Sequence, residues 1–427
     1  MSFDDMGLVQ PLLQAIRDAG YRTPTPIQRD TIEPALARRD IVGCAQTGTG
    51  KTAAFALPVL QHIDAIADDD PKIRALVLSP TRELAAQIGE SFATYGRHLE
   101  VWHTVIFGGV NEKPQIRELS KGVDVLVATP GRLLDLHGRG FVDLSAVDCL
   151  VLDEADHMLD MGFLPDVKRI IAALPPKRQN LLFSATMPPE IRALADDLLH
   201  DPVSVAVAPV SAPADNVEHR LYFVDKGNKR KLLLDLLRSE RPTRTLVFSR
   251  TKHGANRVAQ YLDKGGVRAV AIHGNKSQGA RTRALDVFKR GSTTVLVATD
   301  IAARGIDVEG VSHVINFDLP NVAETYVHRI GRTARAGASG VALSLCDEEE
   351  REYLRDIERL MKRHLERVQE HAYPPSVPPP PPTDLEGRTR SSGARPGAGA
   401  RGSAPGGARK RRPRGASRGR GRSPARR

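Results

Sequence analysis

The segment ALVLSPTRELAAQIGESFATYG (Ala75–Gly96) joins a short aliphatic run to a stretch of helix length. The same order returns in VDVLVATP followed by GRLLDLHGRG, and in CLVLDEA followed by DHMLDMGF. Strands that alternate with helices indicate βαβ units and a mostly parallel sheet, and nearly continuous apolar strands fit a sheet covered on both faces. The sequence therefore predicts an α/β fold.

Two stretches of this part of the chain return 170 residues later. LVLSPTR begins at Leu76 and LVFSRTK at Leu246, while VLVAT occurs at Val125–Thr129 and again at Val295–Thr299. One such match could arise by chance, but two matches at the same offset indicate an internal duplication. We therefore expect two tandem α/β domains, joined by a linker in the proline-containing stretch that precedes residue 217.

Composition sets the predicted boundaries. The first domain spans residues 1–208, the linker 209–216, the second domain 217–370 and the tail 371–427. The charged stretch DEEEREYLRDIERLMKRHLERVQEH after Cys346 predicts a long helix that closes the second domain. The tail is first proline-rich and then rich in arginine and glycine, with almost no aliphatic residue, so it is predicted to be disordered.

The net charge of +11 is unevenly distributed. Residues 374–427 hold fourteen Lys and Arg against two Asp and Glu, so the basic character belongs to the tail and the first 373 residues are near neutral. The three cysteines are far apart, which favours a reducing compartment without a disulfide framework. There is no apolar signal core at the start and no apolar run near the ~20 residues of a membrane span. We expect a cytoplasmic, monomeric protein that has no contact with a membrane.

The segment AQTGTGKT (Ala45–Thr52) follows a short strand and precedes a helical pattern. Glycines let backbone N–H groups approach phosphate oxygens, and the helix N-terminus favours an anion. Lys51 would reach the β- and γ-phosphates, and the Thr52 hydroxyl would bind Mg²⁺. The alternative is a glycine-rich turn that binds nothing. No phosphate loop occurs 170 residues further on, in LYFVDKGNKRK, so the duplication kept one nucleotide site.

The DEAD segment places three carboxylates in four positions, directly after the apolar run Cys149–Leu152. Phosphoryl transfer needs a metal ion, an oriented water and a cation that faces the transition state. Asp153 is the expected partner of Mg²⁺, and Glu154 would orient or deprotonate the attacking water. The alternative is that Asp153 or Asp156 only caps the following helix. The phosphate loop upstream favours the catalytic interpretation.

The segment YVHRIGRTARAG (Tyr326–Gly337) would supply the cation. Its basic residues lie at near-helical spacing: His328, Arg329, Arg332 and Arg335. Arg332 and Arg335 are three residues apart, share a helix face and suit arginine fingers. The alternative is a solvated basic face.

Over about residues 3–360 the chain resembles the DEAD-box ATP-dependent RNA helicases of superfamily 2, in their bacterial type. The resemblance implies two RecA-like domains and the cofactors ATP and Mg²⁺. The motifs that carry it stand in order: GYRTPTPIQ (Gly20–Gln28), AQTGTGKT, PTRELAAQ (Pro80–Gln87), GG (Gly108–Gly109), TPGR (Thr129–Arg132), DEAD, SAT (Ser184–Thr186), VFSRTK, SQGAR, ATDIAARGID and HRIGRTAR. Asn275 and Lys276 stand where the family often has an acidic residue and Met or Leu, and Ala334 where Gly is frequent.

The resemblance implies roles for residues around the nucleotide. Gln28 would read the adenine edge, with Tyr21 and Phe3 packed near the base, and Asp307 would meet the ribose. Arg332 and Arg335 would face the γ-phosphate. Ser184 and Thr186 would couple hydrolysis to domain movement through hydrogen bonds to Asp156 and His328. The phosphate-loop residues implied to bind ATP are Ala45, Gln46, Thr47, Gly48, Thr49, Gly50, Lys51 and Thr52. Those implied to line the RNA backbone are Arg82, Gly109, Thr129, Arg132, Arg250, Gln278, Arg281 and Thr299.

The implied function is RNA-stimulated ATP hydrolysis that drives local, non-processive unwinding of short RNA duplexes or remodelling of RNA–protein complexes. RNA would be bound through its backbone, largely without sequence preference, which fits an aromatic content of 4%. The basic tail would add electrostatic RNA binding. Alternatives are an RNA-annealing chaperone that acts through the tail and a DNA translocase. Ribosome assembly, RNA decay and cold adaptation stay open as pathways, as do their protein partners.

Overall fold

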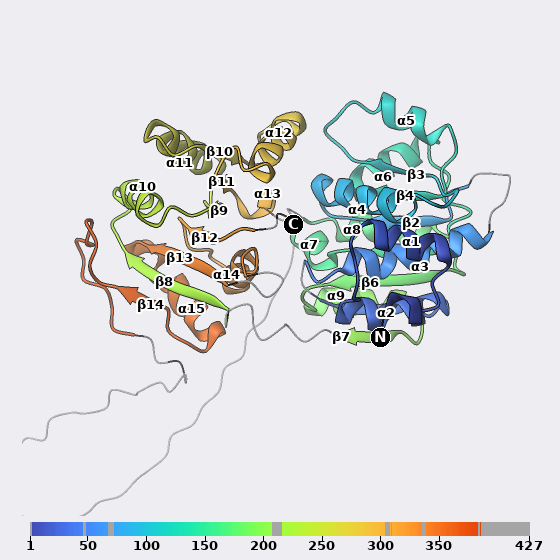
Figure 1. Ribbon diagram of the computed structural model, residues 1–427, viewed down its shortest axis with the longest axis horizontal. Coiled ribbons are helices and arrows are strands. Elements are labelled where there is room, and N and C mark those ends of the chain that lie inside the picture. Colours follow the sequence, from blue (N-terminus) through green and yellow to red (C-terminus); the bar gives the residue numbers. More distant parts are fainter. Residues whose placement is uncertain are drawn as a thin grey trace, which may run out of the picture. The chain divides into compact units, whose positions relative to one another are not determined.

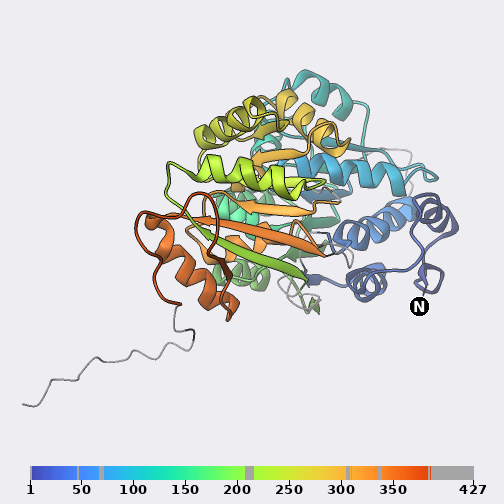
Figure 2. The same cartoon turned by 60° about the vertical axis from the view of Figure 1, so that its left-hand side comes forward.

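The computed structural model describes residues 2–45, 48–66, 72–206, 216–303, 308, 310–334, 339–382 and 385. They belong to one compact unit, Met1–Leu385, that holds two seven-stranded sheets. Figures 1 and 2 show both sheets with helices packed against them. The predicted linker 209–216 lies outside the described residues except for Asn216.

The first sheet has the strand order β3-β4-β2-β5-β6-β1-β7, and all of its pairs are parallel. Its strands are β1 (Ile41–Cys44), β2 (Ala75–Leu78), β3 (His103–Ile106), β4 (Val125–Ala128), β5 (Cys149–Leu152), β6 (Gln179–Ser184) and β7 (Val203–Ala206). Its helices are η1 (Phe3–Asp5), α1 (Gln10–Asp18), α2 (Pro26–Leu36), α3 (Lys51–Ile66), α4 (Arg82–Tyr95), α5 (Lys113–Leu119), α6 (Pro130–Gly138), α7 (Ala155–Asp160), α8 (Leu164–Ala173) and α9 (Pro189–Leu198).

The second sheet repeats this order, position by position, as β10-β11-β9-β12-β13-β8-β14, again with parallel pairs. Its strands are β8 (Val217–Phe223), β9 (Thr245–Phe248), β10 (Ala269–Ile272), β11 (Val295–Ala298), β12 (His313–Asn316), β13 (Gly340–Cys346) and β14 (Glu366–Val368). Its helices are α10 (Lys229–Glu240), α11 (Lys252–Lys264), α12 (Gln278–Lys289), α13 (Asp300–Ala303), α14 (Ala323–Ile330), η2 (Glu348–Glu350) and α15 (Arg351–Met361).

The repeated sequence stretches are neighbouring strands in both sheets. Leu76 of β2 pairs with Leu126 of β4, and Leu246 of β9 pairs with Leu296 of β11. The duplication read from the sequence is therefore also present in the register of the strands. The predicted fold class, two tandem α/β domains with parallel sheets, is confirmed.

Alternate residues of the central strands face opposite cores. Val77 and Val151 belong to one hydrophobic cluster, while Leu76 and Leu150, their chain neighbours, belong to another on the other face. Successive side chains of a strand point to opposite faces, so a sheet covered on both faces needs apolar residues throughout. In the second sheet, α10 and α15 lie on opposite sides of β8 (Figure 2).

The charged stretch after Cys346 does not form the single long helix that its composition predicts. Helix α15 ends at Met361, and Lys362 takes the left-handed conformation with φ of 51°. The chain then forms β14, which pairs with β8 in parallel. A residue with positive φ cannot continue a helix, so the last part of the stretch becomes an edge strand.

The chain stays in contact with the second domain beyond β14. His371 Nε2 lies 3.1 Å from the Phe223 carbonyl oxygen, and the Tyr373 hydroxyl donates to Asp235 at 2.8 Å. The Ser376 hydroxyl donates to Asp225 at 2.6 Å. The boundary at residue 370 stays a prediction. No helix in the described part of the chain is both long and apolar enough to span a membrane.

We expect the substitution Gly89→Ala to destabilise the first domain. A Cβ at Gly89 in α4 would overlap the Val105 side chain of β3. Alanine gains about 1 kcal/mol of helix propensity, but overpacking costs about 1–3 kcal/mol, so the clash should win. Urea unfolding should show a lower free energy of unfolding. As a control, Gly138→Ala in α6, where a Cβ meets nothing within 4 Å, should change it little. Equal effects of the two variants would contradict this packing.

Candidate functional site

The loops after three adjacent strands of the first sheet meet at one edge. β5, β6 and β1 are neighbours, and Asp153 follows β5, Ser184 ends β6, and Lys51 begins the helix after β1. Ligands of open α/β sheets bind at the carboxyl ends of the strands, because the loops there converge. The sheet thus places the phosphate loop beside the acidic cluster.

Lys51 is a buried cation. Its side chain is 6% exposed, and its ammonium lies 4.0 Å from Asp153 Oδ1. Among the described residues Nζ has no hydrogen-bond partner. A buried ammonium without hydrogen bonds is costly, so this position suits an incoming anion. Lys51 opens onto a cavity of about 640 Å³ that is also lined by Gly48, Gly50 and Thr52.

Asp153 and Thr52 line the same cavity and fit a magnesium ion. Burial raises the pKa of Asp153 to about 6, against the opposing charge of Lys51. A carboxylate and a hydroxyl are oxygen donors of the kind that Mg²⁺ prefers. Within the described ranges, no three His, Cys, Asp or Glu side chains are grouped to hold a metal by themselves. A Mg²⁺ ion would complete its shell with phosphate oxygens and water, as it commonly does.

Glu154 is held in an unusual backbone conformation. Its φ and ψ are both 53°, a left-handed geometry that a residue with a Cβ rarely adopts. Burial by itself would raise the pKa of Glu154, but a 2.7 Å contact with His157 Nδ1 and the charges of His157, Lys51 and Arg332 hold it well below its usual value. Glu154 is therefore ionised at neutral pH, as a general base must be.

Asp156 connects the acidic cluster to the SAT segment. Its Oδ2 accepts hydrogen bonds from the Thr186 backbone N–H and hydroxyl, both at 2.9 Å, and the Asp156 N–H donates to Ser184 Oγ at 3.2 Å. The N-cap residue of α7 is Glu154, which makes no side-chain capping bond. The acids of this cluster thus contact the neighbouring loops, which favours the catalytic over the capping interpretation.

The expected adenine end is only partly assembled from the predicted residues. Buried Gln28 accepts from the Thr25 N–H at 2.9 Å and donates to the Gly50 carbonyl at 3.1 Å. Tyr21 is half exposed, and its ring lies 6.2 Å from that of Tyr95, which the sequence did not single out. Phe3 is buried in the hydrophobic core and does not line the cavity. Ala45 is also buried, and its N–H donates to the Ser184 carbonyl at 3.0 Å.

The basic segment of the second domain divides into different roles. Arg332 is buried, and its charge contributes to the low pKa of Glu154. Arg329 is 1% exposed and forms a two-pronged ion pair with Asp300, at 2.5 and 2.8 Å, so it holds the domain together. The His328 ring meets the His157 ring edge-on at 6.0 Å. Four predicted site residues lie outside the described residues: Gln46, Thr47, Asp307 and Arg335.

Four of the predicted RNA residues gather around a residue that sequence reasoning missed. Glu83 accepts from Gln278 Nε2 at 2.9 Å and pairs with Arg281 at 2.8 Å, and Arg82 Nη1 lies 3.4 Å from Gln278 Oε1. Gly109 has φ of 71°, and a Cβ there would collide with the Arg82 guanidinium. Glu83 sits in the first turn of α4, where an acid is favourable to any helix, so nothing in the sequence marked it.

The remaining RNA candidates lie after strands of the two sheets. Arg132 donates to Gln115 at 3.0 Å and to the Val110 carbonyl at 3.3 Å. Thr129 follows β4 and Thr299 follows β11, so these two buried residues hold the same place in the two domains. Arg250 is engaged with the second domain, in an arrangement described below.

Comparison with known families agrees with this geometry. Residues 25–194 match the family described as DEAD/DEAH box helicase, and residues 228–337 match the helicase conserved C-terminal domain. The structure of Dbp5 from S. cerevisiae bound to RNA and ADP BeF3 is similar with a TM-score of 0.76 and 32% identity, over 86% of this chain and 95% of that one.

Two curated relatives are more similar in sequence. The ATP-dependent RNA helicase CshA of Limosilactobacillus reuteri is 43% identical over 85% of this chain and 72% of its own length. The ATP-dependent RNA helicase DBP2 of Candida albicans is 43% identical over 86% of this chain and 66% of its own length. With the phosphate loop, the DEAD cluster and both family domains in place, the chain belongs to the DEAD-box family of ATP-dependent RNA helicases.

Proposed function

We propose that the protein hydrolyses ATP in response to RNA, and that hydrolysis drives local, non-processive unwinding of short duplexes or remodelling of RNA–protein complexes. The observation that carries the proposal is the pairing of two buried groups at one sheet edge. The Lys51 ammonium has no hydrogen-bond partner in the described part of the structure, and the Glu154 carboxylate is ionised and oriented by His157.

The chemistry follows from the positions of these side chains. Lys51 and the loop that precedes it bind the phosphates of ATP. Mg²⁺, held by Asp153 and Thr52, neutralises charge on the phosphates when it is bound. Glu154 accepts a proton from the attacking water, and His157 fixes the direction of its carboxylate. Arg332, whose charge reaches Glu154, and Arg335 offset negative charge that develops on the γ-phosphate.

Hydrolysis is coupled to the protein through the Asp156 contacts. Thr186 donates both its N–H and its hydroxyl to Asp156, so a change at the DEAD cluster moves the SAT loop directly. RNA is bound through its backbone by the residues around Glu83 and by those that follow β4 and β11. Dbp5, which is similar in fold, was solved with RNA and ADP BeF3 bound.

The finer parts of the proposal rest on composition. The basic tail adds electrostatic, sequence-independent RNA binding, because it has many arginines and no aromatic residue after Tyr373. We place the protein in the cytoplasm, as a monomer, with ribosome assembly or RNA decay as its setting. An annealing chaperone with a decayed core is disfavoured by the intact Lys51 and Glu154, and a DNA translocase by family membership.

We expect Glu154→Gln to lower RNA-stimulated ATP turnover by about 10²–10⁴-fold, because the amide cannot take a proton from water. Steady-state turnover should be measured with RNA, with DNA and without nucleic acid. Asp160→Asn, which removes an acid at the end of the same helix, should leave RNA-stimulated turnover near that of the wild type. Wild-type turnover that is equally high with DNA would favour a translocase.

We expect Lys51→Met to remove the stabilisation by nucleotide. A ligand at 100 times its Kd stabilises the folded state by about 2.7 kcal/mol, so Mg·ATP should raise the melting temperature of the wild type. The variant should lose this rise, because methionine cannot bind phosphate. Lys168→Met, on an exposed face of α8, should keep it. A rise that persists in Lys51→Met would exclude Lys51 as the phosphate ligand.

We expect a chain that ends at residue 382 to bind RNA more weakly than the full chain at low salt. This chain keeps the hydrogen bonds of Tyr373 and Ser376. Since each neutralised phosphate releases counterions, the difference should shrink as salt increases, and the plot of log affinity against log salt should be less steep for the short chain. Equal affinities at low salt would show that the tail does not bind RNA.

A further inference from the structure

The second domain carries a lysine in the place of Lys51. Lys51 is the first residue of the helix that follows β1, and Lys229 is the first residue of the helix that follows β8. β1 and β8 hold the same position in the two sheets. The counterpart of the phosphate lysine is therefore Lys229 and not the residue 170 positions after Lys51, because the chain before α10 is longer than the chain before α3.

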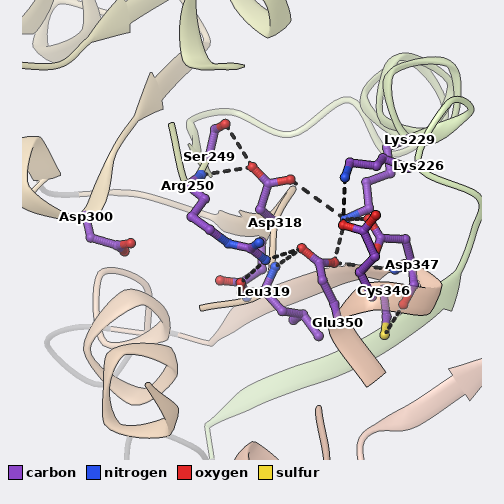
Figure 3. Close-up of polar contacts among 12 residues, drawn as sticks. Lys226, Lys229, Ser249, Arg250, Asp300, Asp318, Leu319, Cys346, Asp347 and Glu350 are labelled. Carbon is purple, nitrogen blue, oxygen red and sulfur yellow. Dashed lines mark hydrogen bonds and ion pairs between the residues drawn. The ribbon is translucent and has the colours of Figure 1, made fainter. Parts of the chain in front are cut away.

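The surroundings of the two lysines differ. Lys229 is 1% exposed, and its ammonium contacts Glu350 Oε2 at 2.5 Å, Asp347 Oδ2 at 3.1 Å and Asp318 Oδ1 at 3.8 Å. Figure 3 shows these acids gathered at the lysine. Where the first domain has a cavity beside its lysine, the second domain has its own carboxylates. Lys229 thus already has the anionic partners that a phosphate would provide.

One of these acids reaches further, to Arg250. Glu350 Oε1 accepts a hydrogen bond from Arg250 Nη2 at 2.6 Å, and the same nitrogen donates to the Leu319 carbonyl at 2.9 Å (Figure 3). The guanidinium also lies 5.2 Å from the centre of the Tyr353 ring. Glu350 therefore bridges two cations, one buried and one at the surface.

The backbone of Arg250 is fixed by the same cluster. The Arg250 N–H and the Ser249 hydroxyl both donate to Asp318 Oδ2 at 2.9 Å. The Arg250 side chain is nevertheless 37% exposed, and in the described part of the structure its hydrogen bonds use Nη2 alone. The remaining guanidinium donors are therefore free to reach a phosphate from solvent.

We propose that Glu350 is a positioning residue for RNA binding, in which it holds the Arg250 guanidinium ready to contact an RNA phosphate while Lys229 balances its charge. The inference rests on the proposed function, since it takes Arg250 as an RNA contact. A long side chain loses conformational freedom when it binds, and an arginine that is ordered beforehand loses less of it. Glu350 does this without touching RNA.

The test is a double-mutant cycle on the RNA concentration that gives half-maximal ATP turnover. Glu350→Gln should raise that concentration about tenfold, the loss expected for one charge-assisted hydrogen bond, with turnover at saturating RNA nearly unchanged. Arg250→Ala should raise it by a similar factor. In the Arg250→Ala background, Glu350→Gln should have no further effect, because Glu350 acts only through Arg250.

The matched control is Glu349→Gln. Glu349 is 69% exposed, pairs with Lys226 at 2.7 Å, and carries the same charge one residue away. It should leave the half-maximal RNA concentration unchanged, which separates a local effect from a change in net charge. If Glu350→Gln does not fold, Glu350→Asp keeps a charge beside Lys229 but is too short to bridge both cations. It should give the same RNA defect.

Two outcomes would overturn the inference. Additive losses in the double variant would mean that Glu350 acts on the fold as a whole and not through Arg250. An unchanged half-maximal RNA concentration in Arg250→Ala would mean that Arg250 does not contact RNA, while RNA-dependent turnover in that variant would leave the proposed function intact. If wild-type turnover does not depend on RNA at all, the proposed function itself fails, and the inference with it.

Discussion

A lysine ammonium buried at the start of a helix needs a negative partner, and the two halves of this protein meet that need differently. In the first domain Lys51 has only Asp153 nearby, at 4.0 Å, and faces a cavity. In the second domain Lys229 is surrounded by Asp318, Asp347 and Glu350. The same position in the same sheet thus becomes a ligand site in one copy and a closed ion cluster in the other.

The rest of the nucleotide site depends on that first lysine and on the edge of the parallel sheet. Neighbouring strands deliver Asp153, Glu154 and Ser184 to one place, and the short loops leave little freedom for their side chains. Glu154 takes a left-handed conformation that costs energy and is kept because the surrounding loops fix it. His157 and Thr186 then orient the two acids that act on water and on the SAT loop.

Much of the fold and of the candidate site was predictable, but in an uneven way. The α/β class, the duplication and the DEAD cluster follow from local patterns, which a strand and its following loop carry within a few residues. The closing helix was predicted too long, because its charged composition does not reveal the left-handed turn at Lys362 or the pairing of β14 with β8. Phe3 lies in the core and not at the cavity, because composition does not tell which side of a helix an aromatic faces.

By itself the sequence determined what kinds of groups are present and in which loops: the phosphate loop, the DEAD and SAT segments, and the basic tail. Only the tertiary structure decided which of them meet. Glu83 contacts Gln278 across 195 positions, and Lys229 contacts Glu350 across 121. The equivalence of Lys229 with Lys51 was hidden from a fixed offset, because loop lengths changed after the duplication. Sheet order did not change, since it is set by the packing of buried strands, and it reveals the match.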